Sequence, residues 1–260
     1  MKRIVVVCEG YHDRSFWSGW LASLECRDCR KHAPEGYRTH YDPHTRDKIA
    51  AGLFGFWSPA DDWVLIVHAD GDRDKVNAVA SHHLRCTASG FDALEIVVNL
   101  DSDVEAGSGH DPAAAHHSSV LKKVRDIDPN ATLGDGVIAL TNGTTRVHPV
   151  IWWTPDPPRP GLPNKQSLER LVCVAIIEAY PERAGEVQTW LDNRSDPPEP
   201  GTKEHAWSYM AGWFASHGCD DFWREVWRND KIRTALLKRL EEIGAAPTVR
   251  SILRLPAATP

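Results

Sequence analysis

The sequence has no long hydrophobic run. Its opening apolar stretch, residues 4–8, ends at Glu9 after five residues, whereas the core of a signal peptide needs about 7–15 apolar residues and a transmembrane helix about 18. Basic residues are not in excess either, because 30 Lys and Arg stand against 36 Asp and Glu, for a formal net charge of −6. These features predict a cytoplasmic protein with no membrane partner, and they argue against one that coats duplex DNA through bulk positive charge.

Two further signals are missing. No phosphate-binding loop of the form G-x-x-x-x-G-K-[ST] occurs in the 260 residues, and no internal repeat is present. The six cysteines, without an export signal, are more often reduced thiols or metal ligands than a disulfide framework. A hydrophobic fraction of 42% with 25% charged residues is near the globular average, which argues against a disordered chain.

The sequence does contain an alternation of strand-like and helix-like segments. Its hydrophobic patterns predict strands at residues 2–8, 63–68, 94–100 and 136–140, with helices at 13–24, 74–84 and 112–124. This alternation is typical of an α/β fold with a mainly parallel sheet flanked by helices, in a Rossmann-like arrangement. A proline-rich connector over 154–163 follows. We therefore expect an α/β domain over residues 1–150 and a C-terminal α-helical extension over 164–260.

Acidic residues follow two of the predicted strands. Glu9 and Asp13 come after the first strand, and Asp101 and Asp103 come after the third. Functional groups of such sheets gather at the carboxyl ends of strands, and an extended backbone would turn Asp101 and Asp103 toward the same side. Carboxylates that converge need a compensating cation, and oxygen ligands suit Mg²⁺ or Mn²⁺. The pattern predicts a divalent-metal site, although a solvated turn at a strand end is the simpler alternative.

Residues 5–13 (VVVCEGYHD) and 96–103 (IVVNLDSD) together resemble the TOPRIM domain of type IA topoisomerases, DnaG-type primases and the nucleases of the overcoming-lysogenization-defect (OLD) family. The resemblance is closest to the OLD nuclease domain. Its E-x-x-x-D, D-x-D and S-x-E motifs and its downstream lysine match Glu9 with Asp13, Asp101 with Asp103, Ser167 with Glu169, and Lys203. The chain departs from that family because it lacks the phosphate-binding loop of the ATPase domain.

The resemblance implies an endonuclease that hydrolyses phosphodiester bonds in DNA, or in RNA, with two Mg²⁺ or Mn²⁺ ions, in a role such as bacterial defence. It assigns metal binding to Glu9, Asp13, Asp101, Asp103 and Glu169. It assigns catalysis to the first four of these together with Lys203, whose charge would stabilise the reacting phosphate. Two alternatives stay open: a nucleic-acid-binding subunit that depends on a separate ATPase partner, and a primase-like nucleotidyltransferase.

Simpler interpretations compete at several of these positions. Asp13 and Glu169 can each serve as an acidic residue in the first turn of a helix. The polar turn at residues 69–72 favours the start of a helix near the active centre over a calcium loop, because no Glu occupies the twelfth position.

Cys26 and Cys29, with His32, His40 and His44, have a spacing close to that of a zinc finger. With 13 histidines in the chain, chance spacing is the alternative.

Basic residues over 223–239 are interleaved with Trp223 and Trp227. This pattern suits either contact with a phosphate backbone or, more simply, a solvated helix face around a buried tryptophan stripe.

Overall fold

The computed structural model describes residues 1–29, 55–86, 91–109, 112–158, 162–211 and 219–256. Its strands are β1 (Lys2–Cys8), β2 (Arg27–Asp28), β3 (Gly55–Trp57), β4 (Trp63–His68), β5 (Ala93–Asp101), β6 (Thr132–Gly134), β7 (Val137–Ala139) and β8 (Thr145–Trp152). Its helices are α1 (Tyr11–Ser23), α2 (Arg73–Arg85), α3 (Pro112–Arg125), α4 (Leu168–Ala179), α5 (Pro181–Asp192), α6 (Lys203–Ala211), α7 (Cys219–Arg228), α8 (Asp230–Glu242) and α9 (Ala245–Leu253).

The described strands form one sheet in the order β2-β3-β4-β1-β5-β8-β7-β6. Its centre is parallel, because β1 pairs in parallel with β4 and with β5, where Val7 is level with Val67 and Val98. Both edges are antiparallel: β3 pairs with β2 and β4, and β7 pairs with β6 and β8. The predicted α/β Rossmann-like class is confirmed, and the antiparallel edges are features that the sequence pattern did not reveal.

Chain segments group into two compact units. Unit 1 comprises Met1–Leu100, Ala113–Val150 and Pro247–Pro260, and unit 2 comprises Asp101–Pro112 and Ile151–Ala246. The sequence places a boundary in the proline-rich connector after residue 150. The compact units do not follow that single boundary. Residues 101–112 come before it but belong to unit 2, and residues 247–260 come after it but belong to unit 1. Each unit is described by itself below.

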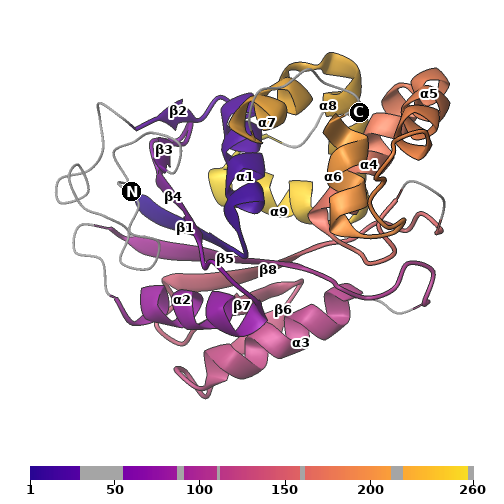
Figure 1. Cartoon of the computed structure of the whole chain (residues 1–260). Helices are drawn as coiled ribbons and strands as arrows, with labels where there is room; N and C mark the ends of the chain where they lie inside the picture. Colours follow the sequence, from indigo (N-terminus) through magenta and orange to yellow (C-terminus); the bar gives the residue numbers. More distant parts are fainter. Residues whose placement is uncertain (30–54, 87–90, 110–111, 159–161, 212–218, 257–260) are drawn as a thin grey trace. The chain divides into compact units, whose positions relative to one another are not determined.

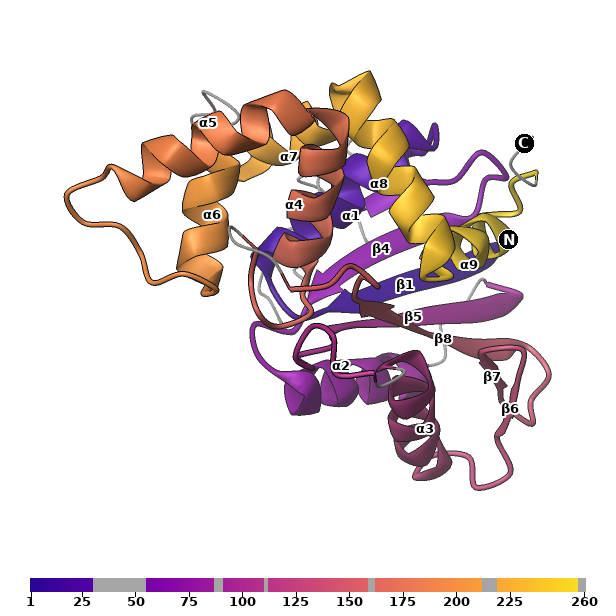
Figure 2. The ribbon, with the colours of Figure 1, turned by 90° about the vertical axis from the view of Figure 1, so that its right-hand side faces the viewer.

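Helices cover both faces of the sheet in unit 1. Figure 1 shows α2 and α3 on one face, with α1 and α9 on the other, and the turned view of Figure 2 agrees. The strands can be buried on both faces because they are runs of β-branched residues, which suit a sheet covered on both sides. On the α2 and α3 face, the core joins Val5, Val7, Leu65, Val67, Val76, Val79, Ile96, Val98, Val120 and Val124. On the other face, Trp17 and Leu21 of α1 and Val249 and Ile252 of α9 lie around Ile4, Val6 and Val97.

Unit 2 is mainly helical and is centred on α4, which packs against α5, α6 and α8, while α7 packs against α8. The apolar face of α4 is fully buried, including Leu171, Val172 and Ile176. Trp223 and Trp227 of α7 are also buried, and the ring of Trp207 lies 5.9 Å from that of Trp223. The interpretation of a buried tryptophan stripe is confirmed for Trp223 and Trp227.

Strand β8 was missed by the sequence pattern. Pro149 lies inside it, and a proline within an apolar run normally argues against a strand because it cannot donate to the hydrogen-bond ladder. The register of β7 with β8 joins Ile138 to Val147 and Ala139 to Arg146, so Pro149 lies beyond that paired stretch. Of the described helices, none has the length and apolar character needed to cross a membrane.

A buried ion-pair network connects β1, β5 and β8 in unit 1. His148 Nε2 donates to Oε2 of Glu95 at 2.7 Å, and Lys2 Nζ donates to Oε1 of the same carboxylate at 3.0 Å. Burial raises the pKa of Glu95, but the hydrogen bonds from His148 and Lys2 outweigh it and bring the pKa below its ordinary value of 4.5. The ionised form of Glu95 therefore stabilises the folded state.

This network predicts an acid-sensitive contribution to stability. Because the folded pKa of Glu95 is lowered, its contribution is complete above the ordinary value of 4.5 and is lost as the pH falls through the folded value. We expect Glu95→Gln to lower the free energy of unfolding at pH 7 and to flatten its decline between about pH 5 and pH 3. Urea unfolding at a series of pH values measures both effects. Glu186→Gln, at an exposed position of α5, is the control. A pH dependence as steep in Glu95→Gln as in the wild type contradicts the assignment.

Candidate active site

Three residues that are far apart in the sequence meet in unit 2. Lys203 Nζ at the start of α6 lies 2.7 Å from Oδ2 of Asp101 at the end of β5, and 3.9 Å from Oε2 of Glu169 in the first turn of α4. Both carboxylates are buried, whereas the Lys203 side chain is 51% exposed. The ammonium group of this partly exposed lysine therefore lies close to two buried carboxylates.

The start of α4 explains the position of two of these groups. Ser167 is the N-cap, and its hydroxyl accepts from the backbone N–H of Arg170. The backbone N–H of Leu168 donates to Oδ1 of Asp101 at 2.8 Å. Asp101 therefore acts as a second cap, and its negative charge lies at the helix end that favours it. One carboxylate oxygen binds the helix and the other binds Lys203.

A short antiparallel contact fixes the segment after Asp101 beside the segment before α4. Asp103 N–H donates to the carbonyl of Gln166 at 3.0 Å, Gln166 N–H donates to the carbonyl of Val104 at 2.9 Å, and Glu105 forms a bridge with Lys165. The side chain of Gln166 also exchanges two hydrogen bonds with the backbone of Thr154. The D-x-D and S-x-E motifs are thus joined by backbone hydrogen bonds, which sequence spacing alone does not reveal.

Asp103 differs from the expectation for an extended segment. Strand β5 ends at Asp101, and Asp103 has a left-handed backbone with φ of 57°. Asp101 is buried while Asp103 is exposed. The extended backbone on which the alternation argument depends therefore ends before Asp103, and the two residues differ in burial. Asp103 lies in the loop that contacts Gln166.

Glu169 has a carboxylate oxygen that suits a cation. The residue is 5% exposed, and its Oε2 atom accepts no hydrogen bond from any described group. A buried ionised oxygen is costly unless a positive charge or a donor satisfies it, and Lys203 at 3.9 Å does so only through longer-range attraction. Two carboxylates of this kind fit a hard divalent cation. Among the residues that the structure describes, no group of three or more His, Cys, Asp or Glu side chains gathers as a metal cage.

In unit 1, Glu9 and Asp13 lie at the junction of β1 and α1. Oδ2 of Asp13 accepts from the backbone N–H of Gly10, the N-cap of α1, at 3.2 Å. Burial raises the pKa of the Cys8 thiol, and the carboxylates of Asp13 and Glu9 raise it further. Asp13 also lies in the first turn of α1, as expected if it serves as an acidic residue at the helix N-terminus.

The polar turn after β4 contacts the same junction. The backbone N–H of Gly71 donates to the carbonyl of Glu9 at 3.2 Å, and that of Ala69 donates to the carbonyl of Cys8 at 2.8 Å. Asp72 is the N-cap of α2 and accepts from the backbone of Asp74 and Lys75. The prediction of a helix start at this turn is confirmed, and in unit 1 the turn lies beside Glu9.

Arg170 is a structural residue that no sequence motif indicates. It is fully buried, and its guanidinium donates to three carbonyls of the proline-rich connector: Pro163 at 2.7 Å, and Asp156 and Pro157 at 2.8 Å each. Proline-rich backbone cannot satisfy its own carbonyls in a helix or a sheet ladder. The sequence feature that could have indicated this role is an arginine within the apolar run of α4, shortly after the connector.

The structure describes only part of the predicted zinc site. Cys26 and Cys29 are buried, and burial raises the pKa of Cys26 to about 12. His32, His40 and His44 of the zinc hypothesis lie outside the described residues.

In the basic segment over 223–239, several side chains form ion pairs within unit 2. Lys238 and Arg239 both bind Glu178, and Arg233 binds Asp230. These pairs reduce the positive charge that this segment could offer to nucleic acid.

Comparison with known proteins gives a likeness of fold. The structure is similar to the crystal structure of a hypothetical protein from Pyrococcus horikoshii OT3, with a TM-score of 0.65, 17% sequence identity, and coverage of 97% of this chain and 100% of that chain. No protein-family model and no curated protein matches the sequence. The likeness supports the α/β fold.

Proposed function

We propose that this protein is a TOPRIM-type nuclease that hydrolyses phosphodiester bonds in DNA with Mg²⁺ or Mn²⁺. The observation that carries the proposal is the convergence of Asp101, Glu169 and Lys203, which the motif resemblance selected from three separate parts of the sequence. Asp101 and Glu169 are 68 positions apart, and Lys203 follows 34 positions later. The ammonium group of Lys203 lies within 4 Å of both carboxylates. This proximity is independent support, because the spacing of the three residues along the sequence does not require it.

Residues of this chain would hold the cation through carboxylate oxygen atoms. Asp101 and Glu169 supply two buried carboxylates, and the resemblance adds Glu9, Asp13 and Asp103. When bound, divalent cations at such a centre activate water and stabilise the leaving oxygen in phosphodiester hydrolysis.

Lys203 has an electrostatic role in this proposal. Without a cation, its ammonium group offsets the charge of Asp101 directly. Because the side chain is half exposed and stands at the first position of α6, it can turn from the acids toward a phosphate. There it would stabilise the negative charge that develops on the phosphate oxygens. The two capping hydrogen bonds at Ser167 and Asp101 hold the start of α4, and so orient Glu169 during the reaction.

The test is a cleavage assay with supercoiled plasmid. We expect the purified protein to nick the plasmid with MnCl₂ or MgCl₂, and the activity to disappear with EDTA and to return when metal is added in excess. Glu9→Ala is expected to remove the activity, whereas Glu204→Gln, at an exposed acid beside Lys203, should retain it. Nicking by Glu9→Ala at the wild-type rate would contradict the proposed nuclease site. Incorporation of labelled nucleotides on a single-stranded template, without nicking, would favour the primase-like alternative.

A further inference from the structure

Backbone hydrogen bonds in unit 2 connect the segment after Asp101 to the start of α6. The N–H of Ala106 donates to the carbonyl of Asn164 at 2.9 Å, and the N–H of Asn164 donates to the carbonyl of Gly201 at 3.0 Å. Lys203, the first residue of α6, comes two positions after Gly201. Asn164, which directly follows the proline-rich connector, therefore joins the segment that carries Asp101 to the segment that carries Lys203.

Position 201 requires glycine for two reasons. Gly201 has a left-handed backbone with φ of 84°, a conformation that residues with a side chain rarely adopt. A Cβ atom at this position would lie 2.5 Å from Nδ2 and 2.7 Å from Cγ of Asn164, whereas non-bonded carbon atoms prefer about 3.5–4.0 Å. The close approach of Gly201 to Asn164 therefore depends on the absence of a side chain.

Thr202 caps α6 directly after this contact. Its hydroxyl accepts from the backbone N–H of His205 at 3.1 Å and donates to the carbonyl of Glu199 at 2.7 Å. A threonine in this position satisfies an N–H group of the first turn and fixes where the helix begins. The Cα atoms of Gly201 and Lys203 are at most about 7 Å apart along the chain. A shift of Gly201 is therefore passed to Lys203 through a short, capped segment.

We propose that Gly201 and Asn164 are positioning residues, whose contact holds the start of α6 where the ammonium group of Lys203 reaches Asp101 and Glu169. Neither residue belongs to the motifs that the resemblance matched. Both act through Lys203, which lies 2.7 Å from Oδ2 of Asp101. Their effect on the position of Lys203 is independent of any activity, and their effect on catalysis rests on the proposed nuclease function.

The experiment measures the reactivity of Lys203 with N-hydroxysuccinimidyl acetate, by mass spectrometry on the peptide that contains it. Pairing with a carboxylate favours the protonated ammonium group, which is not a nucleophile, so the paired lysine reacts slowly. We expect Gly201→Ala to raise the acetylation rate of Lys203 about two- to fivefold, the range for the loss of an ion pair with an exposed partner. Asp101→Asn, which removes the paired carboxylate, gives the upper limit. Lys122, at an exposed position, is the internal reference.

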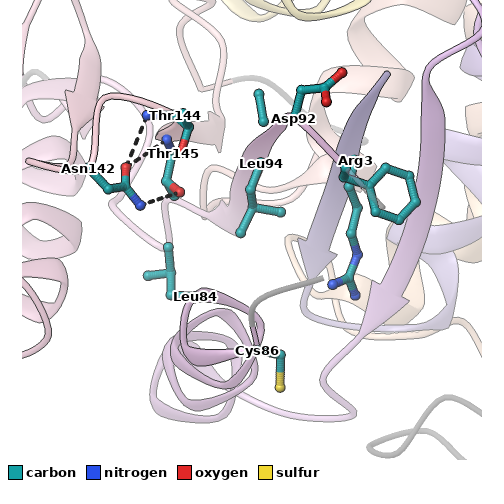
Figure 3. Close-up of a pocket in the computed structure, with 10 residues that line it drawn as sticks. Arg3, Leu84, Cys86, Asp92, Leu94, Asn142, Thr144 and Thr145 are labelled. Carbon is teal, nitrogen blue, oxygen red and sulfur yellow. Dashed lines mark hydrogen bonds between the residues drawn. The ribbon is translucent and has the colours of Figure 1, made fainter. Parts of the chain in front are cut away.

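Two control variants separate the contact from backbone strain and from general loosening. Gly244→Ala introduces similar strain, because Gly244 has φ of 77° and an added Cβ would approach none of the described side chains within 4 Å. Asn142→Ala loosens a loop of unit 1, in which Oδ1 of Asn142 accepts from the backbone N–H groups of Thr144 and Thr145 (Figure 3). Neither control should change the acetylation rate of Lys203.

A double variant tests the contact itself. Asn164→Ala removes Cγ, Nδ2 and Oδ1, the atoms that a Cβ at position 201 would meet, and it keeps both backbone hydrogen bonds. We therefore expect Gly201→Ala combined with Asn164→Ala to return the acetylation of Lys203 toward the wild-type rate. In the plasmid assay, Gly201→Ala should lower kcat about tenfold with little change in KM, because Lys203 is assigned to charge that develops in the transition state.

Three results of the acetylation experiment overturn the positioning role: a wild-type rate in Gly201→Ala, an equal increase in Gly244→Ala or Asn142→Ala, or no recovery in the double variant. If Gly201→Ala does not fold, amide exchange in the wild type decides. The N–H of Asn164 should exchange at least about tenfold more slowly than in an unstructured peptide, and exchange at the peptide rate overturns the contact. A protein that cleaves no plasmid with either metal contradicts the proposed function alone, because the reactivity of Lys203 is measured without cleavage.

Discussion

Replacement of Asp101 by Asn is expected to lower metal-dependent plasmid cleavage by about 100- to 1,000-fold, the usual cost of one electrostatic group in an active site. The amide oxygen of Asn can still accept from the Leu168 N–H and cap α4, so the fold should be retained. What is lost is the negative charge that now attracts Lys203 at 2.7 Å and that would hold a cation. Initial nicking rates at saturating MnCl₂ measure the effect.

Two controls make the Asp101 experiment specific. Glu204→Gln removes a neighbouring exposed charge and should cleave at the wild-type rate, and circular dichroism should show that Asp101→Asn remains folded. Lys203→Met should also lower the cleavage rate, but with less effect on Mn²⁺ affinity, because the lysine is assigned to the phosphate. If Asp101→Asn cleaves as fast as the wild type, Asp101 has no part in the chemistry.

Replacement of Arg170 by Met is expected to lower the free energy of unfolding by about 2–4 kcal/mol. Methionine fills a similar volume, but three carbonyls of the connector lose their donor, and a polar group left unsatisfied in a buried position costs about 1–3 kcal/mol. Two of these three hydrogen bonds are only partly buried, which limits the total. Urea unfolding at neutral pH measures the change.

The matched control for Arg170 is Arg183→Met at an exposed position of α5, where we expect a change within about 0.5 kcal/mol. Arg170→Lys should fall between the two, since one ammonium group cannot reach three carbonyls with the planar fork of a guanidinium. A stability of Arg170→Met equal to that of the wild type would show that the connector does not depend on this residue.

The centre of the sheet could be predicted because its strands are continuous apolar runs. The segments 2–8 and 63–68 coincide with β1 and β4, and the segment 94–100 lies within β5. A strand buried on both faces needs apolar residues at every position, so its limits are visible in the sequence. The short edge strands have no such signature: β6 is exposed along its whole length, and β8 contains a proline.

The candidate site could be predicted in part. Motif order pointed to Asp101, Glu169 and Lys203, which lie together in unit 2. The geometry of Asp103 could not be predicted, because neither its left-handed backbone nor its hydrogen bond to the carbonyl of Gln166 has a signature in the sequence. The hydrogen bonds from Arg170 to the proline-rich connector could not be predicted either, because a single arginine in a helix does not indicate which carbonyls it will bind.

The central claim is that Asp101 and Glu169 hold a divalent cation that Lys203 now partly replaces. Anomalous diffraction at the manganese edge, from crystals soaked in MnCl₂, tests it most directly. We expect an anomalous peak about 2.0–2.4 Å from carboxylate oxygens of both Asp101 and Glu169, with Lys203 Nζ displaced from its 2.7 Å contact with Asp101. Saturating manganese with no peak at either carboxylate, and with Lys203 still bound to Asp101, would contradict it.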